Sequence, residues 1–345
     1  MHEVMHVSKV GAVGDIQSNY SALIESLEKA KFIEIRQGSP VWMAGQSALV
    51  FTGDLVDGGA EPGELLCFIP ILYRAIQEHK GVLVLIKGNH DEMMLQTFSP
   101  FLKKNFPIEE FNKNQYSLQQ LRIWMSKDGD QTLLEMARFK NIELSEMERE
   151  KIKTADQQEV AFPSEFLLSA IQKIVAAYRK EILFLFENMR AAALINGRIL
   201  AFHGAPNFAA QSLNDFITED FEKSREGVLW GRQWLNHPDL EENLKRLVSS
   251  LGGTIQGLIF GHTPQSMFRV SSIKGQCKIG RVVARDLARG IPALYNLMTA
   301  PRAVSQEGGI GILIFDQNNV RALYTTAEIA GSCEVILDSI PLALE

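Results

Sequence analysis

This sequence has few cysteines and no excess of positive charge, and each of these absences excludes a class of protein. The 345 residues include only three cysteines, Cys67, Cys277 and Cys333. An odd and unpatterned set of this kind is typical of buried thiols in a reducing compartment, and it excludes a disulfide framework. The formal net charge of -6 leaves no basic stripe for phosphate backbones, so we expect no nucleic-acid partner.

Long apolar runs are missing as well. No run approaches the roughly 20 residues that a membrane-spanning helix needs, and the first residues lack the basic and apolar regions of a cleavable signal peptide. We therefore expect no membrane partner and a cytoplasmic location. Export by a specialised secretion system, which needs no cleavable peptide, is the alternative. The sequence does not indicate an oligomeric state.

Five short apolar runs are present, and each leads into a glycine beside a side chain that is able to bind a metal ion. They cover residues 7–13, 48–51, 82–86, 199–202 and 258–260. A single aspartate after glycine, as in Gly53-Asp54, is ordinary turn chemistry, but recurrence at five places favours a common site. Buried parallel strands read as such runs, and ligands bind beyond their carboxyl ends. The pattern predicts an α/β sheet with a site at one edge.

The N-terminal part alternates between strands and helices. Helical periodicity over residues 19–30, and again from Pro62 onward, completes a βαβ unit with the apolar runs. Residues 32–41 are polar and turn-rich, which predicts an excursion before the central strand. Near the other end, residues 311–315 and 320–324 flank an Asp-Gln-Asn-Asn turn and predict a β-hairpin.

Between these parts the alternation stops. From about residue 92 the sequence becomes helical and amphipathic for some 100 residues, with a strongly charged section at 143–153. We interpret the chain as a single domain over residues 1–345 that contains a helical insertion at residues 93–196. Packing against the rest of the domain is the expected role of the insertion, and a groove for a partner is the alternative. Because it follows one of the predicted ligands directly, it is also placed to shape access to the site.

The side chains at the five strand ends form a plausible ligand set for a catalytic metal. They are Asp15, Asp54, Asn89, His203 and His262. Oxygen and imidazole ligands without thiolate suit manganese, iron or zinc at catalytic positions. So many ligands favour two ions roughly 3.5–4 Å apart that share a carboxylate and clamp a phosphoryl group. The residue at the end of the central strand, Asp54, is the natural bridge.

Together the motifs resemble a known family. In order along the chain they are Gly14-Asp15-x-Gln17, Gly53-Asp54-x-x-Asp57-Gly58, Gly88-Asn89-His90-Asp91, His203-Gly204 and Gly261-His262-Thr263. This series resembles the calcineurin-like metallophosphoesterases, in particular the branch of bacterial-type phosphoprotein phosphatases and symmetrical diadenosine tetraphosphatases. The resemblance implies an α/β fold, with a metallophosphoesterase-type β-sandwich core flanked by helices.

The resemblance also implies roles for single residues. The first of two divalent ions, manganese or alternatively iron, zinc or magnesium, would be held by Asp15 and Asp54, and the second by Asp54, Asn89, His203 and His262. A hydroxide that bridges the ions would attack phosphorus. His90 would then protonate the leaving oxygen, with Asp57 fixing the tautomer of its ring.

Two positions depart from the family pattern. Gln17 stands where the family usually has a histidine ligand, and a neutral amide oxygen is a weaker ligand for a transition metal. Gly58 stands where eukaryotic-type phosphatases have an arginine that grips phosphate. Arg232, in a Trp-x-Arg segment similar to one in bacterial phosphoprotein phosphatases, is our candidate for that cation. An ordinary surface arginine is the alternative.

Three functions are compatible with these residues. The leading hypothesis is a metal-dependent phosphatase of phosphorylated proteins, acting on phosphoserine, phosphothreonine or phosphotyrosine. Hydrolysis of dinucleoside polyphosphates is the second, although no run of extra cations stands beside the motifs. A catalytically degenerate binding module is the third, and it is favoured by Gln17, Gly58 and the long insertion.

Overall fold

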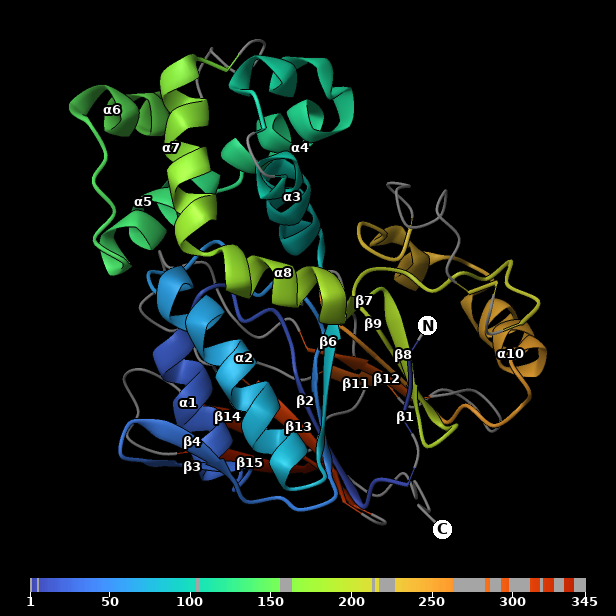
Figure 1. Cartoon of the computed structure of the whole chain (residues 1–345). Helices are drawn as coiled ribbons and strands as arrows, with labels where there is room; N and C mark the ends of the chain where they lie inside the picture. The colour runs from blue at the N-terminus through green and yellow to red at the C-terminus, as the bar shows by residue number, and fades with distance from the viewer. Residues whose placement is uncertain are drawn as a thin grey trace.

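The computed structural model describes residues 2–4, 6–103, 106–155, 163–212, 215–216, 227–262, 283–285, 293–297, 311–316, 319–325 and 332–337. Most of its strands form two facing sheets, with helices outside them and a group of helices at one end (Figure 1). Within these ranges, no helix has both the length and the apolar character that crossing a membrane requires.

The larger sheet has seven strands in the order β15-β14-β13-β2-β5-β6-β7. Four of them run parallel, namely β2 (Lys9–Val13), β5 (Ala48–Phe51), β6 (Val82–Ile86) and β7 (Met189–Arg190). An antiparallel meander extends the sheet beyond β2 through β13 (Gly311–Asp316), β14 (Asn319–Thr325) and β15 (Ser332–Leu337). The predicted C-terminal hairpin is therefore present as β13 and β14.

The smaller sheet has six strands in the order β1-β8-β9-β10-β12-β11. They are β1 (His2–Val4), β8 (Ala192–Ile195), β9 (Ile199–Phe202), β10 (Gly257–Phe260), β12 (Ala293–Asn296) and β11 (Val283–Arg285). Strands β9 and β10 are parallel neighbours. All five apolar runs of the sequence thus lie in the two sheets, and their carboxyl ends point to one region.

Alternation of side chains along the strands creates the core between the sheets. Val50 of β5, Ile199 of β9 and Ile259 of β10 belong to one buried cluster between the sheets. Their neighbours point the other way: Leu49 packs under the helices beside the larger sheet, and Phe260 packs towards the far side of the smaller one. Because both faces of each sheet are covered, the strands are continuously apolar rather than alternating with polar residues.

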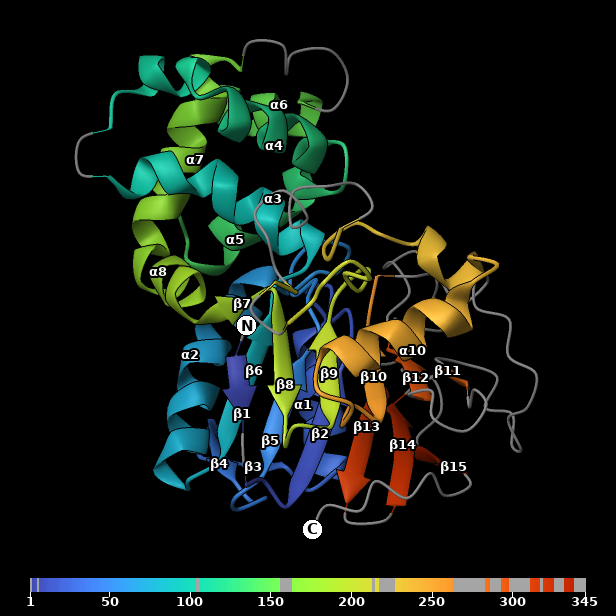
Figure 2. The same ribbon diagram turned by 90° about the vertical axis from the view of Figure 1, so that its right-hand side faces the viewer.

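Helices cover the outer faces. On the larger sheet lie α1 (Tyr20–Lys29) and α2 (Pro62–Glu78), the latter with Pro70 in its interior. On the smaller sheet lies α10 (Leu240–Ser250), which buries Leu244 and Leu247 (Figure 2). The smaller sheet is therefore enclosed by α10 on one side and by the larger sheet on the other.

The chain between β6 and β7 forms the group of helices at the end of the sheets (Figure 1). It consists of α3 (Asn89–Phe98), α4 (Gln115–Met125), α5 (Gly129–Phe139), α6 (Glu146–Thr154), α7 (Glu165–Ala177) and α8 (Arg179–Asn188), with 3-10 turns at Ser99–Leu102 and Ile108–Lys113. Helix starts already at Asn89 and stops at Asn188, so the last residues of the expected helical stretch are strands. The division into one domain with an insertion at 93–196 stays a prediction.

Residues 32–41, expected only as an excursion, belong to a regular β-hairpin of β3 (Ile33–Arg36) and β4 (Ser39–Trp42). Its two-residue turn, Gln37-Gly38, has positive φ at both positions, which matches the twist of the flanking strands. Ile33 and Trp42 anchor the hairpin in the core below the helices. The polar solvent-facing residues masked this alternation in the sequence.

Candidate metal centre

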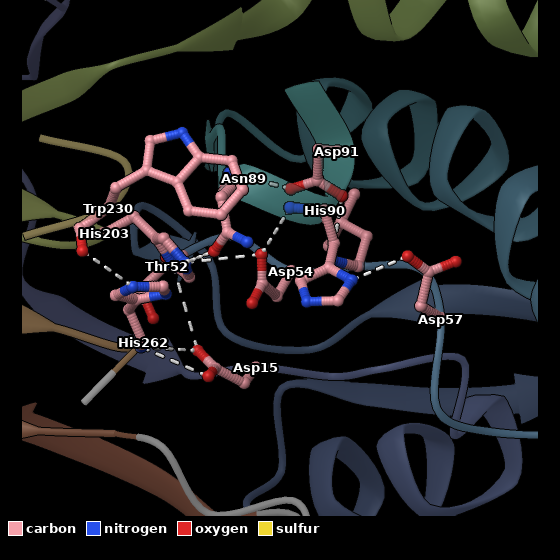
Figure 3. A network of polar contacts seen from close by, with 12 residues as sticks. Asp15, Thr52, Asp54, Asp57, Asn89, His90, Asp91, His203, Trp230 and His262 are labelled. Carbon is pink, nitrogen blue, oxygen red and sulfur yellow. Dashed lines mark hydrogen bonds and ion pairs between the residues drawn. The ribbon is translucent and has the colours of Figure 1, made fainter. Parts of the chain in front are cut away.

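The five predicted ligands converge where the strands of both sheets end (Figure 3). Each follows a strand directly or within a few residues, and each is at most 3% exposed: Asp15 after β2, Asp54 after β5, Asn89 after β6, His203 after β9 and His262 after β10. The structure thus brings together side chains that are far apart in the sequence. Thr263, which completes the last motif, lies outside the described residues.

Asp54 lies at the centre of this group. Its Oδ1 accepts a hydrogen bond from the backbone N–H of His90 at 3.0 Å and lies 3.3 Å from His203 Nε2. Glycines permit this crowding, since a Cβ on Gly88 would overlap Asp54 and one on Gly261 would overlap Asp15. The loop after β5 is also tightly turned, with a φ of 51° at Asp54.

Backbone carbonyls fix the tautomers of His203 and His262. His203 Nδ1 donates to the carbonyl of Thr52 at 2.8 Å, so Nε2 is the nitrogen that faces the site. That Nε2 meets the oxygens of Asn89, at 3.2 Å, and Asp54. A lone pair facing two oxygens is unfavourable unless a cation, either a proton or a metal ion, lies among them.

His262 is oriented in the same manner. Its Nε2 donates to the carbonyl of Trp230 at 3.1 Å, while Nδ1 is buried and has no hydrogen-bond partner among the described residues. Buried polar atoms are rarely left unsatisfied, and a metal-binding histidine typically donates its other N–H to a carbonyl or carboxylate. Ligand atoms of Asp54, His203 and His262 all lie within 4.8 Å of one another. This buried group fits a metal site.

The electrostatics of the metal-free cluster agree with this interpretation. Burial, together with the charge of Asp54, raises the pKa of Asp15 to about 6. Burial would lower the pKa of His203, but Asp54 and Asp15 raise it to about 9. Burial and the neighbouring His203 hold the pKa of His262 below its ordinary value. A divalent cation would take over the charge balance that protons otherwise supply in this buried group.

Next to this group stands a buried pair of an imidazole and a carboxylate. His90 Nδ1 and Asp57 Oδ2 are 2.6 Å apart (Figure 3). Burial opposes a positive charge on His90, but Asp54 and Asp57 overcome it and raise the pKa of His90 to about 9. The imidazolium with Nδ1–H on Asp57 and Nε2–H directed away from it is therefore favoured at neutral pH.

Gln17 and Arg232 are less well defined. Gln17 is buried, and its Oε1 has no hydrogen-bond partner among the described residues, so it offers an oxygen ligand near Gly58. Arg232 is half-buried, and its charge is close enough to contribute to the low pKa of His262. Metal binding by Gln17 and phosphate binding by Arg232 stay predictions, as do the roles of the other candidate residues.

Sequence reasoning left three buried residues without a role. Asp91 accepts hydrogen bonds from the backbone N–H groups of Leu55 and Gly88, at 2.9 and 2.8 Å, and so ties together the loops after β5 and β6. Trp124 and Thr132, from α4 and α5, donate to Asp57. For Asp91 the signal was its place inside Gly88-Asn89-His90-Asp91.

Comparison with known proteins agrees with this geometry. Residues 8–159 match the family of calcineurin-like phosphoesterases. The chain is 32% identical over 95 residues to an uncharacterized protein of Schizosaccharomyces pombe, and 29% identical over 100 residues to Shewanella-like protein phosphatase 2 of Arabidopsis thaliana. These matches cover 26% and 29% of this chain and 27% and 25% of those proteins, so the chain spans about a quarter of the length of the curated relatives it matches.

Among solved structures, a cold-active protein-tyrosine phosphatase of a psychrophilic Shewanella species is similar, with a TM-score of 0.56 over 97% of this chain and 82% of that one. At 16% sequence identity this likeness shows the fold alone. It confirms the predicted fold class, an α/β metallophosphoesterase fold with two mixed sheets flanked by helices. The family match over residues 8–159 and the buried Asp and His group agree with this fold, and in both respects the chain is similar to the calcineurin-like phosphoesterases.

Proposed function

We propose that this chain is a phosphomonoesterase that removes phosphate from phosphorylated serine, threonine or tyrosine in proteins. The observation that carries the proposal is the buried pair of His90 and Asp57 beside the group that fits a metal ion. In this pair, His90 is a proton donor that Asp57 holds in place, and it lies beside a group that fits a metal ion. Cleavage of a phosphate ester uses both a proton donor for the leaving oxygen and a cation for the phosphoryl oxygens. Two of the similar proteins, which are named as a protein phosphatase and a protein-tyrosine phosphatase, support the substrate class.

The proposal includes two divalent ions, of which manganese is our first choice. One would be held by Asp15, Gln17 and Asp54, and the other by Asp54, Asn89, His203 and His262. When bound, such ions lower the pKa of water and offset negative charge on phosphoryl oxygens. The mixed oxygen and imidazole donors, without a thiolate, suit manganese or iron better than structural zinc.

The chain's own groups would handle the leaving oxygen. As the bond from phosphorus to that oxygen breaks, the oxygen takes the electron pair and receives the proton of His90 Nε2. Asp57 keeps Nδ1 protonated and the ring oriented, and it stabilises the imidazolium before transfer. Arg232 would bind the phosphoryl oxygens through its planar fork. A phosphorylated protein is the partner that this proposal requires, and it invokes neither nucleic acid nor membrane.

Competing substrates on one manganese-loaded preparation test the proposal. We expect hydrolysis of p-nitrophenyl phosphate and of phosphopeptides, with diadenosine tetraphosphate a poor substrate. Asp54→Asn should lose metal and activity together, whereas His90→Ala should keep its metal and lose activity. A matched control is His79→Ala, because the ring of His79 forms a hydrogen bond with the carbonyl of Ala75 near the end of α2 and lies outside the site.

The outcomes separate the three functions. A strong preference for the dinucleotide would replace the proposal by polyphosphate hydrolysis. Two bound metal ions without turnover of any phosphate ester would favour a binding module. Equal rates of hydrolysis for wild type and His90→Ala would show that His90 is not the proton donor.

A further inference from the structure

The group of helices at the end of the sheets reaches into the site and supplies two donors to Asp57. Trp124 Nε1 lies 2.9 Å from both carboxylate oxygens of Asp57, and Thr132 Oγ1 lies 2.5 Å from Oδ1. Trp124, Thr132 and Asp57 are each at most 1% exposed. Together with His90, the carboxylate therefore has three buried donors on its two oxygens.

The turn between α4 and α5 places these donors. Trp124 lies at the end of α4, and its ring packs edge-on against Phe98 of α3 with centroids 5.4 Å apart. The chain then turns through Asp128, whose φ of 73° is left-handed, and α5 begins at Gly129. A Cβ on Gly129 would lie 2.8 Å from the indole, so only glycine lets α5 begin this close to the ring. Thr132, in the first turn of α5, then faces Asp57.

This arrangement does more than fill space. A carboxylate buried to this degree loses its hydration, so donors from the protein have to replace the hydrogen bonds that water would supply. Thr132 donates to Oδ1, and the Trp124 N–H is shared between Oδ1 and Oδ2, which leaves the remaining direction on Oδ2 for His90. Donors on both oxygens also fix rotation of the carboxylate, and hence the orientation of the imidazole that it holds.

We infer that Trp124 and Thr132 are positioning residues for proton donation, acting on His90 through Asp57. The inference rests on the proposed function, in which the His90 Nε2 proton moves to the leaving oxygen while water supplies a hydroxyl group to phosphorus. The other proton of that water passes to solvent, and His90 regains a proton from solvent. Loss of either donor should weaken that transfer and leave the metal-binding groups in place. The defect should therefore depend on how much the leaving oxygen needs a proton.

Leaving groups of different basicity give the readout. Phenyl phosphate releases a basic oxygen that needs a proton, whereas 2,4-dinitrophenyl phosphate releases a weakly basic one that leaves without help. The variants are Trp124→Phe, which keeps a ring against Phe98, and Thr132→Val, which keeps the shape. Thr132→Ser restores the hydroxyl. The matched control is Trp42→Phe, because Trp42 is equally buried and its Nε1 donates to the carbonyl of Gly45, outside the site.

We expect Trp124→Phe and Thr132→Val to lower kcat on phenyl phosphate by about 10- to 100-fold, a part of the range that general acid catalysis contributes. On 2,4-dinitrophenyl phosphate they should stay within about threefold of wild type, with unchanged metal content. Thr132→Ser should recover most of the loss, and Trp42→Phe should show none. Equal losses on both substrates, or no loss on phenyl phosphate, would overturn the inference. If Trp124→Phe does not fold, the comparison of Thr132→Val with Thr132→Ser tests the inference.

A second measurement does not depend on turnover. In magnesium-loaded protein, the short hydrogen bond between His90 and Asp57 should give a far-downfield proton signal in the NMR spectrum, which His90→Ala assigns by its loss. We expect Trp124→Phe and Thr132→Val to shift or broaden this signal, and Trp42→Phe to leave it unchanged. An unchanged signal in both site variants would refute positioning. If the wild type hydrolyses neither aryl ester with metal bound, the proposed function fails, and the NMR comparison still decides the positioning role.

Discussion

Replacing Gly88 by alanine should disable the site, because the added methyl group would occupy space that Asp54 fills. The backbone of Gly88 is extended, with φ of -93° and ψ of 175°, so any residue can adopt it and strain does not enter. A Cβ built there overlaps Asp54 Oδ1 and its backbone nitrogen, and lies 3.0 Å from Cγ. Since the clash includes main chain, a change of side-chain rotamer at Asp54 cannot relieve it.

The size of the expected loss of stability and activity depends on how far the loops after β5 and β6 must move apart. Separating the Cβ from the backbone nitrogen to ordinary contact takes roughly 1 Å, and overpacking of this kind costs about 1–3 kcal/mol of folding free energy. The same movement carries Asn89 and His90 away from Asp54. A displacement of about 1 Å at reacting groups can lower the rate by about 100-fold. We therefore expect modest destabilisation and a much larger loss of activity.

Three measurements on Gly88→Ala test this reasoning: metal content of the purified protein, denaturation by urea, and kcat/KM on p-nitrophenyl phosphate. Gly197→Ala is the control, because a Cβ at Gly197 meets nothing within 4 Å and only its positive φ of 66° adds strain. The control should lose about 1 kcal/mol of stability and keep its activity. Activity of Gly88→Ala within about threefold of wild type, with full metal content, would refute the steric account.

Removing the metal should stop hydrolysis and lower Tm, because an ion at about 100 times its Kd stabilises the fold by about 2.7 kcal/mol. Thermal melts before chelation, after chelation and after manganese is returned test this. Asp57→Asn should move the alkaline limb of the kcat profile for phenyl phosphate to lower pH, because Asp57 helps to hold the pKa of His90 near 9; an unmoved limb would contradict it. Glu148→Gln should destabilise the chain at neutral pH but not in acid. Burial opposes its charge, yet Lys173 and Ser145 lower the pKa of Glu148 to about 2, so its contribution is present above pH 4.5 and fades as pH falls towards 2. With Lys173 half-exposed and solvent screening the pair, we expect about 1–2 kcal/mol in urea denaturation at neutral pH, and little of this difference once the pH has fallen to about 2. Equal differences at both pH values would exclude this origin.

The apolar runs allowed the central strands to be located from the sequence, because a strand covered on both faces needs no alternation. The predicted residues 48–51, 82–86 and 199–202 agree with the observed strands β5, β6 and β9. Strands that lie at an edge or beside helices were harder to find. The hairpin of β3 and β4 has polar outer residues, and β7 and β8 follow α8 with little polar sequence between them, so they read as a continuation of helix.

For the site, the sequence was informative about ligand types and poor about what holds them. Glycine beside Asp, Asn or His marked each strand end, which is why the pattern alone places Asp54 and His203 in one group. Orientation depends on tertiary contacts between distant residues. The carbonyls of Thr52 and Trp230 that fix the rings of His203 and His262 leave no local pattern in the sequence.

The long sequence separations at the metal centre also set the order of events during synthesis. Asp15 accepts from the backbone of His262, 247 residues later in the chain. A nascent chain that has completed only residues 8–159 carries Asp15, Asp54 and Asn89 but neither histidine, so its oxygen ligands would bind abundant magnesium and manganese with little distinction. In the proposed site, selective loading would require the second sheet to have docked on the first. Metal uptake would thereby depend on a long-range step of folding that brings residues from both parts of the chain together.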